Sequence, residues 1–175
     1  MIKPLAACCM LLFAGAAAAE DIPNPLIDYP AFQSGVIAVG KLRADRRLSE
    51  LDFIVMSKDP DTVILDARSA EKYALLHIKG AVNLSFPDMT AEELARIIPR
   101  KDTRVLIYCN NNFTNEQKAF PTKALPASLN VFTFNALHAY GYTNVYELGP
   151  MIDIRKTRLP FEGSRQRVVQ AAARR

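Results

Sequence analysis

The chain has 175 residues, half of them hydrophobic, and a formal net charge of +4. Four of its 22 basic residues lie in the last twelve positions, SRQRVVQAAARR, so the positive excess belongs to the C-terminal tail rather than to the body. A sequence of this size fits one domain with a sizeable core. A basic tail alone does not indicate a nucleic-acid-binding protein, and we expect no nucleic-acid partner.

The first 19 residues have the features of a secretory signal peptide. Lys3 precedes an apolar run, and Ala17 and Ala19 form an A-x-A cleavage pattern before Glu20. The apolar run is too short and too rich in alanine to span a bilayer comfortably. We therefore expect cleavage after Ala19, export to a bacterial periplasm, and no membrane insertion afterwards. The alternative is a lipid-modified Cys8, but almost no hydrophobic segment precedes that residue.

Cleavage would remove Cys8 and Cys9 and leave Cys109 as the single cysteine. Cysteines in an oxidising compartment usually pair. A solitary one is therefore either a buried, inert side chain or a thiol with a chemical role. The two histidines and this cysteine are too widely spaced to indicate a metal site, and we expect no cofactor.

Residues 20–47 form an N-terminal segment whose first part is rich in proline. We expect this segment to be extended, with a short edge strand at Val36–Val39. The next segment, 48–57, has the spacing of a helix. The expected hydrophobic face of that helix comprises Leu48, Leu51, Ile54 and Val55.

Continuous apolar runs at 63–65 and 105–107 indicate strands that are buried on both faces of a parallel sheet. The remaining predicted elements are strands at 82–84 and 144–148 and helices at 70–76, 90–98 and 129–140. This alternation predicts an α/β domain over residues 48–163, with a central, mostly parallel sheet flanked by helices. Residues 164–175 are expected to be a basic, solvated tail.

Several motifs between Thr62 and Gly163 resemble those of the rhodanese-like domain family. The strand that ends in DAR at 66–68, the segment HIKGAVN at 77–83, the strand before Cys109 and the segment GYTNVY at 141–146 occur in the family's order and spacing. The resemblance implies the family's fold and its sulfur-transfer chemistry. In that chemistry a cysteine thiolate takes sulfane sulfur from a donor such as thiosulfate and holds it as a persulfide. The persulfide then passes to a thiol or cyanide acceptor.

On this resemblance Cys109 is the catalytic residue, and it lies where ligands bind in such sheets, at the carboxyl end of a strand. The loop that follows departs from the family pattern. The usual loop is short, often ends in arginine and runs directly into a helix. Here no arginine occurs between Cys109 and Arg155, and the helix is expected to start only near Ser128. Thiosulfate as the donor is therefore in question, because a dianion needs a cationic partner.

The candidate substrate-binding residues include the first five of this loop, which are Asn110, Asn111, Asn112, Phe113 and Thr114. Asparagines tolerate tight turns and can also direct N–H groups toward a sulfur, and both interpretations stay open. Phe113 is alternatively an anchor or a lid for the loop.

Three cations are further candidates. Lys118 and Lys123 are in position to replace the missing arginine if the long loop folds back over its start. Arg68 follows a strand at the same edge of the sheet, and its alternative role is a salt bridge with Asp66 or Glu71.

The leading hypothesis is a periplasmic sulfurtransferase that uses a small sulfur-containing donor and a thiol or cyanide acceptor. The alternative is an inactive binding module, whose long loop recognises a partner that the sequence does not identify. A phosphatase would need an arginine to hold phosphoryl oxygens, and thiol–disulfide exchange would need a second cysteine.

Overall fold

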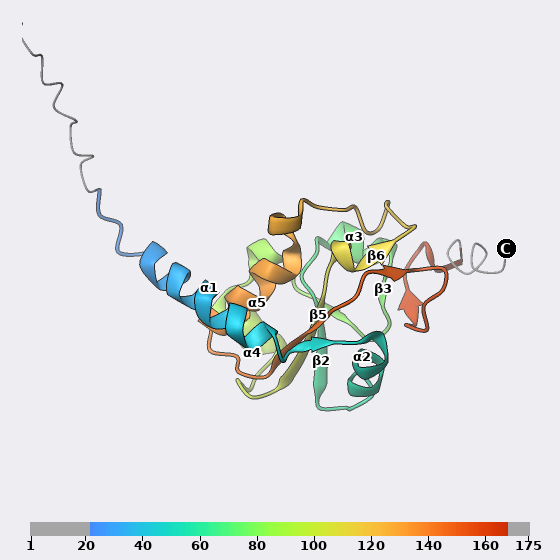
Figure 1. The fold of residues 1–175 in the computed structure, drawn as a ribbon, viewed down its shortest axis with the longest axis horizontal. Coiled ribbons are helices and arrows are strands. Elements are labelled where there is room, and N and C mark those ends of the chain that lie inside the picture. Colours follow the sequence, from blue (N-terminus) through green and yellow to red (C-terminus); the bar gives the residue numbers. More distant parts are fainter. Residues whose placement is uncertain (1–21, 168–175) are drawn as a thin grey trace, which may run out of the picture.

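The computed structural model describes residues 22–167 and is built around a five-stranded sheet (Figure 1). Neighbouring strands of this sheet are all parallel, in the order β1-β7-β5-β2-β4. The strands are β1 (Arg47–Leu48), β2 (Thr62–Asp66), β4 (Val82–Asn83), β5 (Arg104–Tyr108) and β7 (Val145–Leu148). The predicted α/β fold with a parallel central sheet is confirmed. The signal peptide predicted at residues 1–19 lies outside the described residues, as does the tail beyond residue 167.

Helices cover both faces of the sheet. On one face lie α1 (Tyr29–Arg43), α4 (Ala91–Ile97) and α5 (Leu129–Ala139), and on the other lie α2 (Glu50–Met56) and α3 (Ala70–Leu75). Successive residues of β5 divide between two hydrophobic cores, because side chains alternate along a strand. Val105 and Ile107 pack on the α1–α4–α5 face, whereas Leu106 and Tyr108 pack on the α2–α3 face. None of the helices within 22–167 is long and apolar enough to cross a membrane.

Residues 29–43 of the N-terminal segment form a helix, so the predicted strand at Val36–Val39 was wrong, and of the described proline-rich part only residues 22–28 lie outside a helix. Pro30 is in the first turn of α1, where a missing N–H costs nothing. Asp28 caps the helix by accepting the N–H of Ala31 at 2.8 Å. Val39 is fully buried against the sheet, whereas the first half of α1 projects away from the body (Figure 1).

The predicted hydrophobic face of α2 was only partly right, because Leu48 and Ile54 contact the core but the other two predicted residues do not. Phe53 is the fully buried residue of this helix, whereas Leu51 and Val55 are exposed. A helix of seven residues makes fewer than two turns, so its periodicity is too short to define a face. The other predicted elements form within two residues of their expected ends, as usual for such boundaries.

The segment after β5 is a packed insertion, which we call the 113–127 insert. It begins with β6 (Phe113–Thr114), which pairs in parallel with β8 (Ile152–Asp153). Its aromatic residues join the core on the α2–α3 face, where the rings of Phe113 and Phe120 lie 4.5 Å apart and both contact Phe161. Phe161 belongs to β9 (Phe161–Glu162), which pairs antiparallel with β3 (His77–Ile78).

An ion pair between Glu116 and Arg165 connects the insert to the C-terminal end of the described chain. Glu116, which is buried, accepts hydrogen bonds from Nε and Nη2 of Arg165 at 2.7 and 2.9 Å. Arg165 was expected in a solvated tail. Because Arg165 binds Glu116, residues 164–167 belong to the folded body instead. The last residues of the insert form a 3₁₀ turn, Leu125–Ala127, that leads into α5.

Candidate functional site

Cys109 lies at the carboxyl end of β5, the central strand of the sheet. A 3₁₀ turn, Asn110–Asn112, follows it directly. Asn112 closes this turn, because its Oδ1 accepts the N–H of Cys109 at 2.9 Å. The Nδ2 of Asn112 donates to the carbonyls of Leu148 and Pro150 at 2.8 and 3.1 Å. The turn that carries Cys109 is thereby fixed to the end of β7.

The thiol of Cys109 lies at the N-terminus of α5. Ser128 is the N-cap residue of that helix, but its side chain makes no capping hydrogen bond. Its hydroxyl instead lies 3.3 Å from the Cys109 sulfur. The N-terminus of a helix carries partial positive charge and unpaired N–H groups, both of which stabilise an anion. The Ser128 hydroxyl is thus a hydrogen-bond donor available to the sulfur at the start of α5.

A polar pocket of about 330 Å³ opens beside this thiol, and we call it the Cys109 pocket. Cys109 is buried, with 1% of its surface exposed, and forms part of the wall of this pocket. The lining comprises Arg43, Arg47, Cys109, Asn111, Asn112, Leu125, Ser128, Asn130, Val131, Glu147, Leu148 and Gly149. The charged residues of the lining are thus two arginines and one glutamate.

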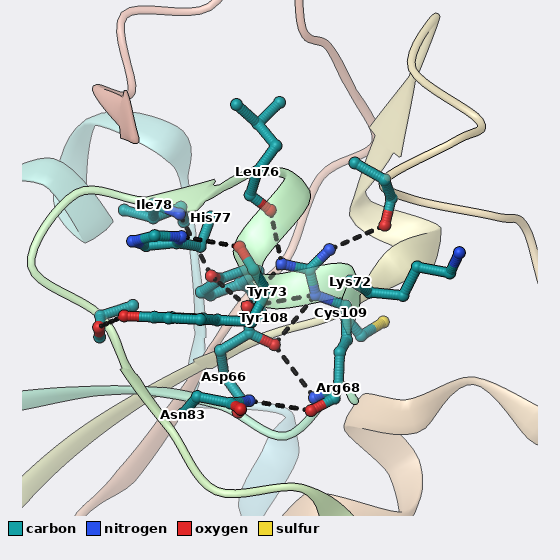
Figure 2. Close-up of polar contacts among 12 residues, drawn as sticks. Asp66, Arg68, Lys72, Tyr73, Leu76, His77, Ile78, Asn83, Tyr108 and Cys109 are labelled. Atoms are coloured by element: carbon teal, nitrogen blue, oxygen red, sulfur yellow. Dashed lines mark hydrogen bonds and ion pairs between the residues drawn. The ribbon is translucent and has the colours of Figure 1, made fainter. Parts of the chain in front are cut away.

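The alternation of side chains explains why Cys109 and Glu147 share this pocket. Tyr108 points to the α2–α3 face, so Cys109, the next residue, points to the α1–α4–α5 face. Figure 2 shows the sulfur directed away from the Tyr108 ring. On the neighbouring strand β7, Val145 faces the α1–α4–α5 core, and Glu147, two residues later, lies on the same face. Glu147 is a buried carboxylate that Arg43 and Arg47 hold at 2.6 and 3.1 Å.

A second pocket of about 410 Å³ lies on the other side of the Asn110–Asn112 turn. We call it the Lys123 pocket, and its lining comprises Ala67, Arg68, Ser69, Lys72, Ser85, Phe86, Pro87, Asn110, Pro121, Lys123 and Leu129. Asn110 is buried, and its Oδ1 has no hydrogen-bond partner among the described residues.

The predicted binding residues therefore divide between two places. Asn111 and Asn112 line the Cys109 pocket with the catalytic candidate, whereas Asn110, Arg68 and Lys123 line the Lys123 pocket. Asn111 also exchanges two hydrogen bonds of 2.9 Å with the backbone N–H and carbonyl of Lys123, which joins the start of the loop to the end of the insert.

Three predicted residues do not line either pocket. Phe113 is buried in the aromatic core, and Thr114 belongs to the strand pair with β8. Lys118 is exposed on the outer side of the insert. Neither lysine of the loop lines the Cys109 pocket, so neither is in position to replace the missing arginine there. The insert carries them outward because its aromatic residues pack inward.

Arg68 forms the salt bridge that was its alternative role. Its guanidinium is fully buried and binds Asp66 Oδ2 at 2.5 Å, the Leu76 carbonyl at 2.7 Å and the Ala119 carbonyl at 2.9 Å (Figure 2). Burial is the largest single effect and lowers the pKa of Arg68, but the hydrogen bonds and charge attraction of Asp66, with smaller contributions from Tyr108, together leave the pKa raised. Arg68 is thus a fixed internal cation that holds the insert at Ala119.

Tyr108 completes this buried network. Its hydroxyl donates to Asp66 Oδ2 at 2.6 Å and accepts the N–H of Ile78 at 3.1 Å. Burial, with the nearby charge of Asp66, raises the pKa of Tyr108 well above its usual value. His77 lies outside the Cys109 pocket, stacked on the Tyr73 ring at 3.8 Å, with its Nδ1 2.8 Å from the Tyr73 carbonyl.

Sequence reasoning missed most of the side chains that surround the thiol. They are Arg43, Arg47, Ser128, Asn130 and Glu147. A signal for some of them exists, because Glu147 interrupts the apolar strand VYEL and a buried carboxylate needs a cationic partner. The segment RADRR at 43–47 supplies such cations, but the sequence does not show that these two segments meet.

The chain was compared with known proteins. The family model of the rhodanese-like domain matches residues 50–149. No curated protein matches the chain.

Solved structures with a similar fold include the BH2092 protein from Bacillus halodurans, which is 18% identical, with 77% of this chain and 85% of that chain covered and a TM-score of 0.47. A second is protein hp1203 from Helicobacter pylori, at 23% identity, 69% and 92% coverage and a TM-score of 0.45. A third, described as rhodanese with anions from E. coli, is 22% identical, with 59% and 99% coverage and a TM-score of 0.40. The family model spans more than half of the sequence, and on that match the chain belongs to the rhodanese-like domain family.

Proposed function

We propose that this protein is a periplasmic sulfurtransferase that carries sulfane sulfur as a persulfide on Cys109. One observation supports the proposal above all others. The single cysteine of the described residues lines a polar pocket at the carboxyl end of the central strand, with its sulfur at the N-terminus of α5. A structural cysteine that only fills a core has no need of a polar pocket or of a hydroxyl turned toward it.

The proposed reaction has two displacement steps. In the first, the Cys109 thiolate attacks the outer sulfur of a donor such as thiosulfate. A bond forms between Sγ and that sulfur, the sulfur–sulfur bond of the donor breaks, and sulfite leaves with the electron pair. In the second, an acceptor thiolate or cyanide attacks the outer sulfur of the persulfide, and Cys109 leaves as the thiolate. No external oxidant or reductant is consumed.

The pocket supports both steps. A persulfide is one atom longer than a thiolate and keeps a negative charge, so it needs space and hydrogen-bond donors beyond Sγ. The Cys109 pocket provides the space, and the Ser128 hydroxyl with the N-terminus of α5 provides donors. The location of the reaction is inferred from the signal peptide predicted at residues 1–19.

Intact mass spectrometry tests the proposal. After incubation with thiosulfate or inorganic polysulfide, the purified protein should gain about 32 Da, and Cys109→Ser should abolish the gain, because only a thiolate retains the transferred sulfur. A later addition of cyanide should remove the added mass and release thiocyanate. Absence of the added mass with both donors would refute the enzyme and leave an inactive binding module.

N-terminal sequencing of protein from a periplasmic extract tests the location. The expected first residue is Glu20. A lipid-modified start at Cys8 or Cys9 would replace the soluble periplasmic protein by one anchored in a membrane.

A further inference from the structure

Two arginines from the N-terminal segment lie on the wall of the Cys109 pocket. Arg43 is the last residue of α1, and Arg47 is the first residue of β1. Both precede the part of the chain that the family model matches, which begins at residue 50. Because β1 pairs with β7 at the edge of the sheet, Arg47 is brought beside Glu147, its partner in the strand register.

Glu147 organises the two guanidinium groups. Its Oε1 is contacted by Arg43 Nη2 at 2.6 Å and by Arg47 Nε at 3.1 Å. The Nη2 of Arg47 also donates to the Gly149 carbonyl at 2.9 Å, which fixes the plane of the guanidinium. We call these three side chains the Arg43–Glu147–Arg47 clamp. With two arginines and one glutamate, the clamp contributes one net positive charge to the pocket.

The exposure of the clamp differs along its length. The side chain of Glu147 is 2% exposed, that of Arg43 is 30% exposed and that of Arg47 is 56% exposed. Nη1 of Arg47 makes no hydrogen bond to any of the described residues. Arg47 therefore keeps donors for a ligand, while the buried carboxylate holds its inner side in place.

Unpaired polar atoms gather at the same site. Within residues 22–167, the buried side-chain atoms without a hydrogen-bond partner include Arg43 Nε, Asn130 Oδ1 and Glu147 Oε2, and all three residues line the Cys109 pocket. Buried polar atoms are rarely left unpaired, and such atoms need an explanation. Among these three atoms Arg43 Nε is a donor, so Arg43 has an unused N–H group beside the pocket.

We propose that Arg47, positioned by Glu147 and assisted by Arg43, binds the anionic end of the sulfur donor. The donor's sulfane sulfur then faces Cys109, and its charged end lies toward the pocket mouth. These residues take the role that a loop arginine has in the family pattern. The clamp thus determines specificity for negatively charged donors over neutral ones, an inference that rests on the proposed sulfur transfer.

The best test compares Arg47→Gln with Arg46→Gln. Both remove one positive charge from adjacent positions, but Arg46 lies over the Tyr146 ring and does not line the Cys109 pocket. Binding is first measured in a Cys109→Ser background by calorimetry with thiosulfate, so that no sulfur is transferred. Arg47→Gln should weaken binding about fivefold to tenfold, the size of one hydrogen bond lost at a half-exposed site. Arg46→Gln should change it by less than about twofold.

Kinetics with the intact thiol form the second measurement. Arg47→Gln should raise the KM for thiosulfate about fivefold to tenfold and leave the KM for a neutral dialkyl trisulfide unchanged, because only the dianion uses the positive charge. Arg47→Lys should restore part of the affinity, since it keeps the charge but loses the planar fork.

The outcomes separate the clamp from the proposed function. If Arg46→Gln and Arg47→Gln weaken thiosulfate binding equally, or if the Cys109→Ser protein does not bind thiosulfate although the intact protein forms a persulfide, the clamp is refuted and sulfur transfer stands. If binding depends on Arg47 but no persulfide forms, the clamp stands as an anion site and sulfur transfer is refuted.

Discussion

At the scale of single residues, Ser128 is both the N-cap residue of α5 and the residue whose hydroxyl contacts the Cys109 sulfur, and one hydroxyl rarely serves both roles. A serine before a helix normally accepts a backbone N–H of the first turn. The Ser128 side chain makes no such capping hydrogen bond, and its hydroxyl contacts the Cys109 sulfur instead. A residue that gives up a stabilising local bond for a contact with a thiol is better explained by the chemistry of that thiol than by folding.

Ser128→Ala should therefore affect sulfur transfer more than stability. We expect the free energy of unfolding to change by less than about 0.5 kcal/mol, since no capping bond is lost. Persulfide formation should slow about threefold to tenfold, because a hydrogen-bond donor to the anionic sulfur is removed.

The control is Ser49→Ala, which removes a capping hydrogen bond, the 3.1 Å bond that Ser49 Oγ accepts from the N–H of Asp52. It should cost about 1 kcal/mol and leave the transfer rate unchanged. A destabilised Ser128→Ala protein with normal kinetics would assign Ser128 to the helix alone.

Tyr108 links stability to alkaline pH. Burial, with the charge of Asp66, holds its pKa well above the usual value of the phenol. A group whose pKa is higher in the folded state stabilises that state fully below its unfolded pKa, which is about 10 for tyrosine. That contribution is lost as the pH rises from there toward the folded pKa.

Tyr108→Phe should lower the free energy of unfolding by about 1 to 3 kcal/mol at neutral pH, because it leaves Asp66 and the Ile78 N–H without this partner. It should also flatten the loss of stability above about pH 10, because the group responsible for that loss is gone. Urea unfolding at several pH values measures both effects. Tyr29→Phe serves as the control, since Tyr29 is exposed. An alkaline profile identical to that of the unaltered protein would contradict the assignment.

At the scale of elements, the central strands could be predicted and the N-terminal helix could not. The strands β2 and β5 are buried on both faces, so their sequences are continuous apolar runs that few other structures produce. The segment before residue 44 contains several prolines, which suggested an extended chain. Pro30 is nevertheless compatible with a helix because it occupies the first turn, and only the cap at Asp28 reveals this.

The packing of the 113–127 insert is a second feature that could not be predicted from the sequence. The sequence indicated a long polar loop, which in one alternative recognises a partner, but its two phenylalanines complete the core on the α2–α3 face. Which side of a sheet needs extra hydrophobic area depends on helices elsewhere in the chain. A loop sequence alone does not contain that information.

Phe120→Ala should destabilise the protein strongly, whereas Leu125→Ala should not. Phe120 is completely buried among aromatic rings, and its truncation should cost about 3 to 5 kcal/mol. Leu125 belongs to the same insert but is 82% exposed, so its truncation should cost less than about 0.5 kcal/mol. The denaturant concentrations at the midpoints of unfolding, measured for both variants and for the unaltered protein, test this difference in stability. Equal, small effects would show that the insert does not contribute to the core.

At the scale of the whole molecule, the site is assembled from segments that are distant in the sequence. The thiol and its serine come from either end of the insert, and the clamp joins the N-terminal segment to β7. The place of Cys109 at the end of a buried strand was predictable, because the apolar run before it indicates that strand, and its catalytic role stays a prediction. The charged surroundings of Cys109 were not predictable, since the parallel pairing of β1 with β7 creates them.

The N-terminal segment should consequently be part of the stable domain, not an appendage. Removal of residues 20–46 would delete Val39 from the core on the α1–α4–α5 face and leave the buried Glu147 without Arg43. Glu147 would then keep only Arg47, which is more than half exposed, so the lost partner and the lost core residue together should make this protein unfold at a much lower temperature. A shorter deletion, of residues 20–27, serves as the control. Its described residues are all exposed and the cap at Asp28 is kept, so the unfolding temperature should stay nearly unchanged.

Circular dichroism against temperature compares the two deletions with the full chain. If both unfold at the temperature of the full chain, the fold is complete without α1, and the clamp lacks the rigid support that its role requires.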